Sequence, residues 1–180
     1  MLARLVPDGW YSFEKVEAGR LLDENLLPAF EVQRRQISPG VAAHGESNLN
    51  AELGGSLSAR LVRHRLIAYV TLRQYAGLSF KVAFAQAGAD SATVAIALER
   101  YRLAHGEFPA ELAALVPGFL TRVPTDIING QPLHYERNAD GSFLLYSVGW
   151  NAIPEGGLLA VEPQTGVVNA RQGDWVWRGP

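Results

Sequence analysis

Histidine and acidic side chains occur together twice in this sequence, in a pattern that could bind a metal ion. The tripeptide His-Gly-Glu occupies residues 44–46 and again residues 105–107. Two such pairs could hold zinc or iron if they converged, because imidazole and carboxylate groups bind both metals. The HExxH spacing, which places two histidines on one helix face, does not occur. A glycine between two ligands is more typical of a solvated turn, and His105 also suits a helix C-terminus, where a positive imidazole is favourable.

Serine side chains could act as nucleophiles in a second kind of catalytic site. Ser12 and Lys15 match the S-x-x-K pattern of penicillin-recognising enzymes, but the S-D-N and K-T-G motifs of those enzymes are missing. Ser47 and Ser79 each lie near a basic residue without a third residue to orient the pair. The sequence also has no G-x-S-x-G turn, Walker loop or GxGxxG motif. These serines are therefore interpreted as surface or capping residues, and the catalytic residues stay unknown.

The composition excludes several classes of protein. The chain has 180 residues, of which 48% are hydrophobic and 19% charged, and its net charge of −2 argues against a nucleic-acid binder. With no cysteine, disulfides, thiolate zinc sites and cysteine nucleophiles are all excluded. Residues 1–10 lack the apolar run of a signal peptide, and five basic side chains interrupt the longest apolar stretch, residues 61–89. We therefore expect no membrane segment in this chain.

Helical periodicity dominates the first half of the sequence. Residues 1–55 are predicted to form a helical region that ends in a linker rich in Gly, Asn and Ser at residues 39–55. Residues 56–89 are predicted to form one long helix with its arginines in solvent, and Ser56 can cap it. Gly88 is expected to interrupt the helical pattern, and Gly106 to end the next helix in a left-handed conformation.

Strand periodicity replaces helical periodicity after Pro132. Apolar residues alternate on both sides of residues 138–141, where Asp140 and Gly141 supply the positive φ angles of a tight hairpin turn. A second turn is predicted at residues 164–166, and residues 174–177 are predicted to end the chain as a short strand. The fold class is therefore α+β, with a helical N-terminal half and a long helix packed on a small antiparallel sheet.

Four segments of the C-terminal half resemble the soluble domain of type II secretion major pseudopilins. They are residues 97–109 with their Gly, aromatic and Pro ending, residues 123–135, residues 143–149, and the pairs Gly156-Gly157 and Asp174-Trp175. The resemblance covers residues 92–178 and implies a pseudopilin-like α+β domain over residues 90–180. The same module also resembles the tail of longer bacterial membrane-attached proteins. That relationship implies an extracytoplasmic location, whereas the chain as it stands indicates a cytoplasmic one.

The resemblance also implies a calcium site. In pseudopilins the loop after the second strand binds calcium through carbonyl oxygens and carboxylates, and the matching stretch here is residues 149–157. That stretch contains Asn151 and Glu155, and Asp174 lies downstream. These three residues are the implied ligands, because calcium takes about six to eight oxygen ligands on irregular backbone. A hydrogen-bonded turn with solvated acids is the alternative interpretation.

Two functions from different classes follow. The resemblance implies a non-catalytic structural or interaction domain, stabilised by calcium, that binds protein partners or associates with itself. The alternative is a small metal-assisted hydrolase of an ester or lactone, with His44, His105 or His134 as the base.

Overall fold

The computed structural model describes residues 8–180 and shows an α+β fold that divides into two compact units. One unit comprises the chain up to Glu31 together with Gly40–Ser79, and the other comprises Val32–Pro39 together with Phe80–Pro180. Residues 1–7, which belong to the first predicted helical region, lie outside the described residues. No helix within residues 8–180 has the length and apolar character needed to cross a bilayer.

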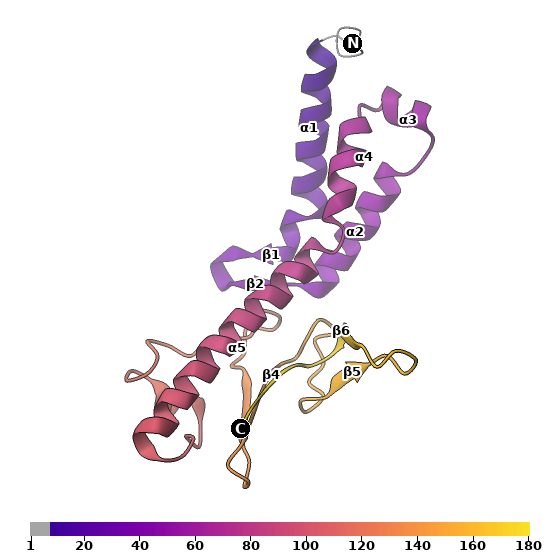
Figure 1. Ribbon diagram of the computed structural model, residues 1–180. Helices are drawn as coiled ribbons and strands as arrows, with labels where there is room; N and C mark the ends of the chain where they lie inside the picture. Colours follow the sequence, from indigo (N-terminus) through magenta and orange to yellow (C-terminus); the bar gives the residue numbers. More distant parts are fainter. Residues whose placement is uncertain (1–7) are drawn as a thin grey trace. The chain divides into compact units, whose positions relative to one another are not determined.

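The first unit is helical. Its elements are α1 (Asp8–Asn25), the 3-10 turn η2 (Leu27–Ala29), β1 (Phe30–Glu31), α2 (Pro39–Leu53), α3 (Leu57–Val62), α4 (Leu66–Leu72) and the 3-10 turn η4 (Arg73–Tyr75). Helices α1, α2 and α4 run beside one another (Figure 1). They share a core of small and branched apolar residues: Leu21, Leu26, Leu49, Leu53, Ala68 and Leu72.

The predicted linker at residues 39–55 is wrong, because most of this segment is the helix α2. Gly45 explains the difference. A Cβ atom at Gly45 would lie 1.8 Å from the backbone oxygen of Asn25, so only glycine lets α2 approach the end of α1 this closely. Packing against α1 therefore outweighs the low helix propensity of the Gly, Asn and Ser residues. The helix ends at Leu53, and Ser56 caps the next helix as predicted, since its hydroxyl accepts the Ala59 amide.

The predicted long helix over residues 56–89 is also wrong, because α3, α4 and η4 divide its first part. His64 adopts a positive φ of 52° between α3 and α4, which a continuous helix does not allow. The helix α4 then begins anew against Glu14, a fully buried residue whose carboxylate accepts the amides of Leu66 and Ile67 at 3.0 and 2.8 Å. A carboxylate from α1 thus satisfies the first free amides of α4.

Arg65, which was expected to face solvent, is held in an ion-pair network instead. Its guanidinium contacts Glu17 at 2.7 Å and Glu52 at 2.9 Å. Arg20 joins the same two carboxylates, each at 2.9 Å. Because these residues come from α1, α2 and the turn before α4, the network ties the three helices together.

The second unit contains the longest helix and all the larger strands. Its elements are η3 (Val32–Arg34), β2 (Gln36–Ile37), α5 (Leu78–His105), the 3-10 turn η5 (Leu112–Leu115), β3 (His134–Arg137), β4 (Phe143–Ser147), β5 (Leu159–Val161), β6 (Val168–Gly173) and β7 (Trp175–Gly179). Helix α5 passes through Gly88 without a break, so the expected interruption there is wrong. It ends as predicted at Gly106, which has a φ of 86°.

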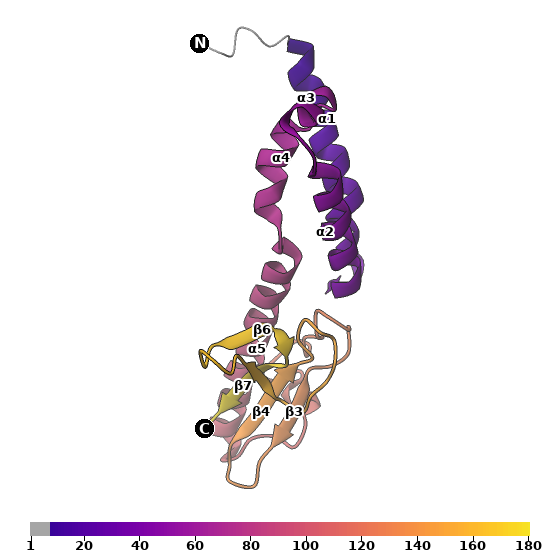
Figure 2. The same cartoon turned by 90° about the vertical axis from the view of Figure 1, so that its right-hand side faces the viewer.

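The strands that follow α5 form two small antiparallel sheets. One has the order β3–β4–β7 (Figure 2), and the other pairs β5 with β6 (Figure 1). Helix α5 packs on one face of the three-stranded sheet, where Val94, Ala97 and Leu98 meet Phe143 and Leu145. The predicted hairpin at residues 138–141, the turn at residues 164–166 and the closing strand are all confirmed.

Candidate functional site

The candidate site is the loop at residues 149–157 together with Asp174, the residue between β6 and β7. Asp174 is 1% exposed. Its carboxylate accepts the amide of Glu155 at 3.1 Å and the amide of Gly157 at 2.7 Å, while its own amide donates to the Leu158 carbonyl at 2.9 Å. Hydrogen bonds to a carboxylate are stronger than those between neutral groups. Asp174 therefore fixes the end of the loop to the start of β7.

The other two predicted ligands have different surroundings. Asn151 uses its side-chain oxygen to accept the amide of Ile153 at 3.2 Å, which is a local turn interaction. The Glu155 side chain is exposed, and its contact with Asp174 is made by its backbone amide. Across residues 8–180, no three His, Asp or Glu side chains gather in a group suited to a metal ion.

A second buried aspartate holds the other end of the same segment. Asp126 is 2% exposed, and its carboxylate accepts the amides of Ile128 and Val148, both at 2.9 Å. In the sequence Asp126 belongs to the segment of residues 123–135 that resembles the pseudopilins, and nothing local shows that Val148, far along the chain, is its partner. Two buried carboxylates therefore bind the backbone at both ends of residues 148–157.

The tryptophans near this loop belong partly to an aromatic cluster. Phe80 of α5 lies 5.5 Å from Trp150 and 6.2 Å from Trp175 between ring centres, and Phe84 lies 5.3 Å from Trp175. All three pairs are edge to face, a favourable geometry for aromatic rings. Trp175 is thus a core residue of this unit. Trp177 differs, since 41% of it is exposed.

An apolar groove lies beside this cluster, between α5 and β7. It has a volume of about 360 Å³. Its walls include Phe84, Ala85 and Gly88 of α5, Leu159 of β5, Val168 of β6 and Trp177 of β7. The register pairs Trp177 with Leu145, so Trp177 lies on the helix-covered face of the sheet and extends that face to its edge.

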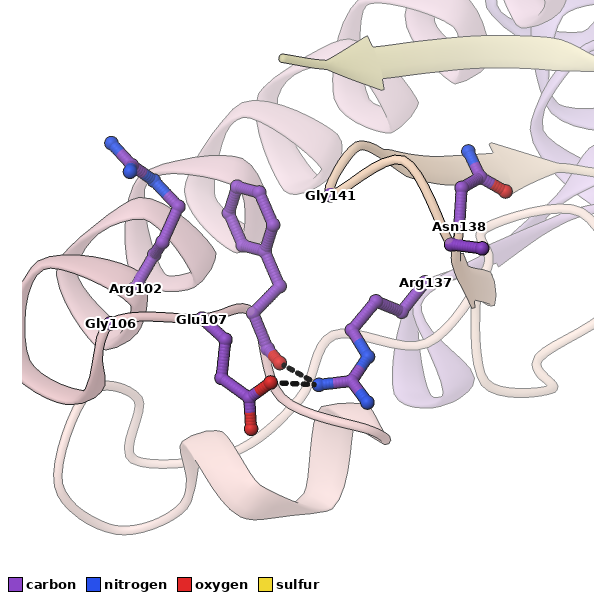
Figure 3. A pocket seen from close by; sticks show the side chains of 8 residues that line it. Arg102, Gly106, Glu107, Arg137, Asn138 and Gly141 are labelled. Carbon is purple, nitrogen blue, oxygen red and sulfur yellow. Dashed lines mark hydrogen bonds and ion pairs between the residues drawn. The ribbon is translucent and has the colours of Figure 1, made fainter.

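A second, polar pocket of about 470 Å³ lies between the end of α5 and the β3–β4 turn. Arg137 donates to the Phe108 carbonyl at 2.9 Å and pairs with Glu107 at 3.0 Å (Figure 3). Arg102 points away from Arg137 (Figure 3) and donates to Glu99 at 2.9 Å. The two arginines therefore do not converge on one point, and each is balanced by a glutamate.

The candidate catalytic side chains serve structural contacts. His44 is exposed and hydrogen-bonds Asn48 at 3.1 Å. His105 stacks on Tyr101 at the end of α5, with ring centres 4.0 Å apart. His134 stacks on its cross-strand neighbour Tyr146 at 4.6 Å.

The serine motifs are likewise explained by their positions. Ser12 and Lys15 are exposed on α1, and the buried Glu14 between them caps α4. Ser47 is exposed on α2, as expected. Ser79 is buried near the start of α5 and its hydroxyl has no hydrogen-bond partner among the described residues, so its interpretation as a surface or capping residue is wrong.

Comparison with known proteins gives no relative for this chain: no family model, no curated protein and no solved structure matches it.

Proposed function

We propose that this chain is a non-catalytic interaction module with a pseudopilin-like domain at residues 90–180. The observation that carries the proposal is the exposed apolar surface of the β5–β6 hairpin. Its large side chains Leu159, Val161, Val167 and Val168 have exposed fractions from 44% for Leu159 to 62% for Val167. Contiguous apolar side chains on a protein surface are typical of protein interaction sites.

Hydrogen bonds and a close strand contact hold the base of this hairpin, which favours binding. The Asp174 amide donates to Leu158 beside β5, and the Asp174 carboxylate holds Gly157. A Cβ atom at Gly173 would lie 2.6 Å from the Ala160 backbone nitrogen, so the two strands approach closely there. A surface that is ordered before binding loses less conformational entropy when a partner binds.

The interaction proposal is tested by replacing the cross-strand pair Val161 and Val168 with threonine. Threonine keeps the branched shape but lowers the apolar area, so the hairpin should persist. Exposed helix residues Val62 and Val70 of the first unit, changed in the same way, provide the control. Sedimentation equilibrium measures self-association, and capture from extracts of the source cells measures partner binding. We expect only the hairpin variant to lose association.

Equal association by both variants would contradict the proposal. So would hydrolysis of a chromogenic ester or lactone that Asp174→Asn abolishes while the circular dichroism spectrum stays unchanged. Such hydrolysis would favour the metal-assisted hydrolase.

We also propose that calcium stabilises this module at the loop of residues 149–157. Asp174, Glu155 and Asn151 would hold the ion together with backbone carbonyl oxygens, which calcium accepts as readily as carboxylates. The buried Asp174 carboxylate supports this location, although it already accepts two amides. A bound calcium ion would place its positive charge in a loop whose backbone these hydrogen bonds already fix.

Calcium binding is tested by thermal unfolding of chelated protein with and without calcium. A ligand at a hundredfold excess over Kd stabilises the folded state by about 2.7 kcal/mol, which raises Tm by several degrees. The rise should be lost in Glu155→Gln combined with Asn151→Ala, which leaves the Asp174 hydrogen bonds intact. An unchanged Tm of the parent protein in millimolar calcium would contradict the site.

A further inference from the structure

We propose that the groove between α5 and β7 binds an extended peptide of a partner protein, which adds to the sheet as a strand on the edge of β7. The proposal rests on the proposed interaction function and names the chemistry of the partner. The peptide would place apolar side chains in the groove and an acidic side chain near Arg178.

The free edge of β7 specifies an extended backbone. In the order β3–β4–β7, strand β7 pairs with β4 over residues 175–179, and no strand pairs with its other edge within residues 8–180. An edge strand presents unpaired amide and carbonyl groups, which another extended chain can satisfy. Peptides that add to a sheet in this way gain affinity from the backbone and specificity from adjacent side-chain pockets.

The groove supplies such a pocket directly beside that edge. Ala85 and Gly88 are the small residues of its α5 wall, and the open space at Gly88 would admit a Cβ atom without any contact within 4 Å. Trp177 forms the opposite wall and keeps 41% of its surface exposed. A peptide side chain entering from the β7 edge would therefore cover Trp177, a residue type enriched at the centres of interfaces.

The charge of Arg178 on β7 favours an acidic residue in the peptide. Arg178 follows Trp177 on β7, so its exposed side chain lies on the opposite face of the sheet from the groove, where it donates to the Gly157 carbonyl at 3.5 Å. The acidic residue in the groove wall, Asp174, is buried and engaged with backbone amides. A peptide paired with β7 presents side chains to both faces of the sheet, so an apolar face toward the groove and an acidic side chain on the other face, beside Arg178, would complement this edge.

The probe is a synthetic octapeptide in which valine and threonine alternate and aspartate occupies both ends. Binding to the full chain is followed by tryptophan fluorescence and by hydrogen exchange of the amides of residues 175–179. Two control peptides carry lysine in place of aspartate, or methyl groups on alternate backbone nitrogens. We expect the first to bind more weakly and the second, which cannot pair with a strand, not to bind.

Variants of the protein locate the site. Gly88→Leu should fill the groove without disturbing the fold, and it should weaken octapeptide binding about tenfold or more. Gly19→Leu makes the same change on α1, where Gly19 also has open space, and should leave binding unchanged. Arg178→Gln should reduce the difference in affinity between the aspartate and lysine peptides.

Several results would overturn the peptide groove. They are no binding of the octapeptide at millimolar concentration, equal binding of its methylated form, or equal binding by Gly88→Leu. A self-association that Gly88→Leu abolishes would identify a second copy of this chain as the occupant, and it would also overturn the proposal. If partner association persists in Gly88→Leu but is lost in the threonine variant of the hairpin, the groove proposal is wrong and the proposed function stands. If association persists in both variants, the proposed function is wrong as well.

Discussion

Replacing Asp126 with alanine should strongly destabilise the second unit. The substitution removes the acceptor for two backbone amides, those of Ile128 and Val148. Asp126 is 2% exposed, so water does not readily replace the carboxylate. A buried donor left without a partner costs about 1–3 kcal/mol, and two of them give an expected loss of about 3–5 kcal/mol.

Asp126→Asn should have an intermediate effect. The amide oxygen can still accept the Ile128 amide, but the side-chain NH₂ group would then face the Val148 amide, which is also a donor. We expect a loss of about 2–3 kcal/mol.

Asp140 provides the matched control, because its carboxylate also accepts a backbone amide, that of Ser142 at 2.9 Å. Asp140 is exposed in the hairpin turn, so water can satisfy the amide after substitution. Asp140→Ala should therefore cost less than about 1 kcal/mol.

The assay is urea unfolding followed by tryptophan fluorescence, since Trp150, Trp175 and Trp177 all belong to the second unit. Hydrogen exchange of the Val148 amide should accelerate in Asp126→Ala. A free energy of unfolding within about 1 kcal/mol of the parent protein would refute the reasoning, because it would mean that the two amides find other acceptors.

Three further perturbations test the first unit. Glu14→Ala should destabilise it by about 2–4 kcal/mol, measured by urea unfolding with circular dichroism, because two N-terminal amides of α4 lose their buried acceptor. Hydrogen bonds from Arg20 and Arg65 lower the pKa of Glu17 from 4.5 to about 2, so its stabilisation is complete above pH 4.5 and declines as the pH falls toward 2. That contribution should be about 1–2 kcal/mol after solvent screening, and Glu17→Gln should remove the corresponding part of the pH dependence. Gly45→Ala should lower Tm by several degrees, since its methyl group would overlap the backbone at the end of α1; an unchanged Tm would contradict the close contact.

The C-terminal strands could be predicted from sequence because their signals are local. The turn at residues 138–141 has its Asp-Gly pair, and Gly141 adopts the expected positive φ of 85°. Every second residue of β4 is buried, namely Phe143, Leu145 and Ser147, and this follows the alternation seen in the sequence. Strand periodicity and turn residues act within a few residues of each other, so no tertiary information was needed.

The helical breaks could not be predicted because tertiary contacts decide them. Residues 39–53 look like a linker by composition, yet Gly45 allows the close helix contact that makes them α2. The apolar residues 56–89 look like one helix, yet Glu14 on α1 provides a new start at Leu66. Both causes lie in another element of the chain, where local periodicity carries no information.

The candidate site was predicted in part. The resemblance identified Asp174 and the loop of residues 149–157, and Asp174 does contact the backbone of Glu155. The residue types could not show that Glu155 makes this contact through its backbone amide, because that depends on how the loop folds. The apolar groove was missed because it combines α5 with β7, whose pairing on the sheet edge appears only in three dimensions.

The two buried aspartates connect the site with the proposed function. Asp126 fixes Val148 after β4, and Asp174 fixes Gly157 before β5. The loop between them therefore begins and ends at set positions, and so does the apolar hairpin that follows it. Because Asp174 also precedes β7, the same carboxylate positions the hairpin and the edge strand relative to each other. Loss of this residue should then weaken partner binding although it presents no side chain to the partner, and the effect would be that of a positioning residue.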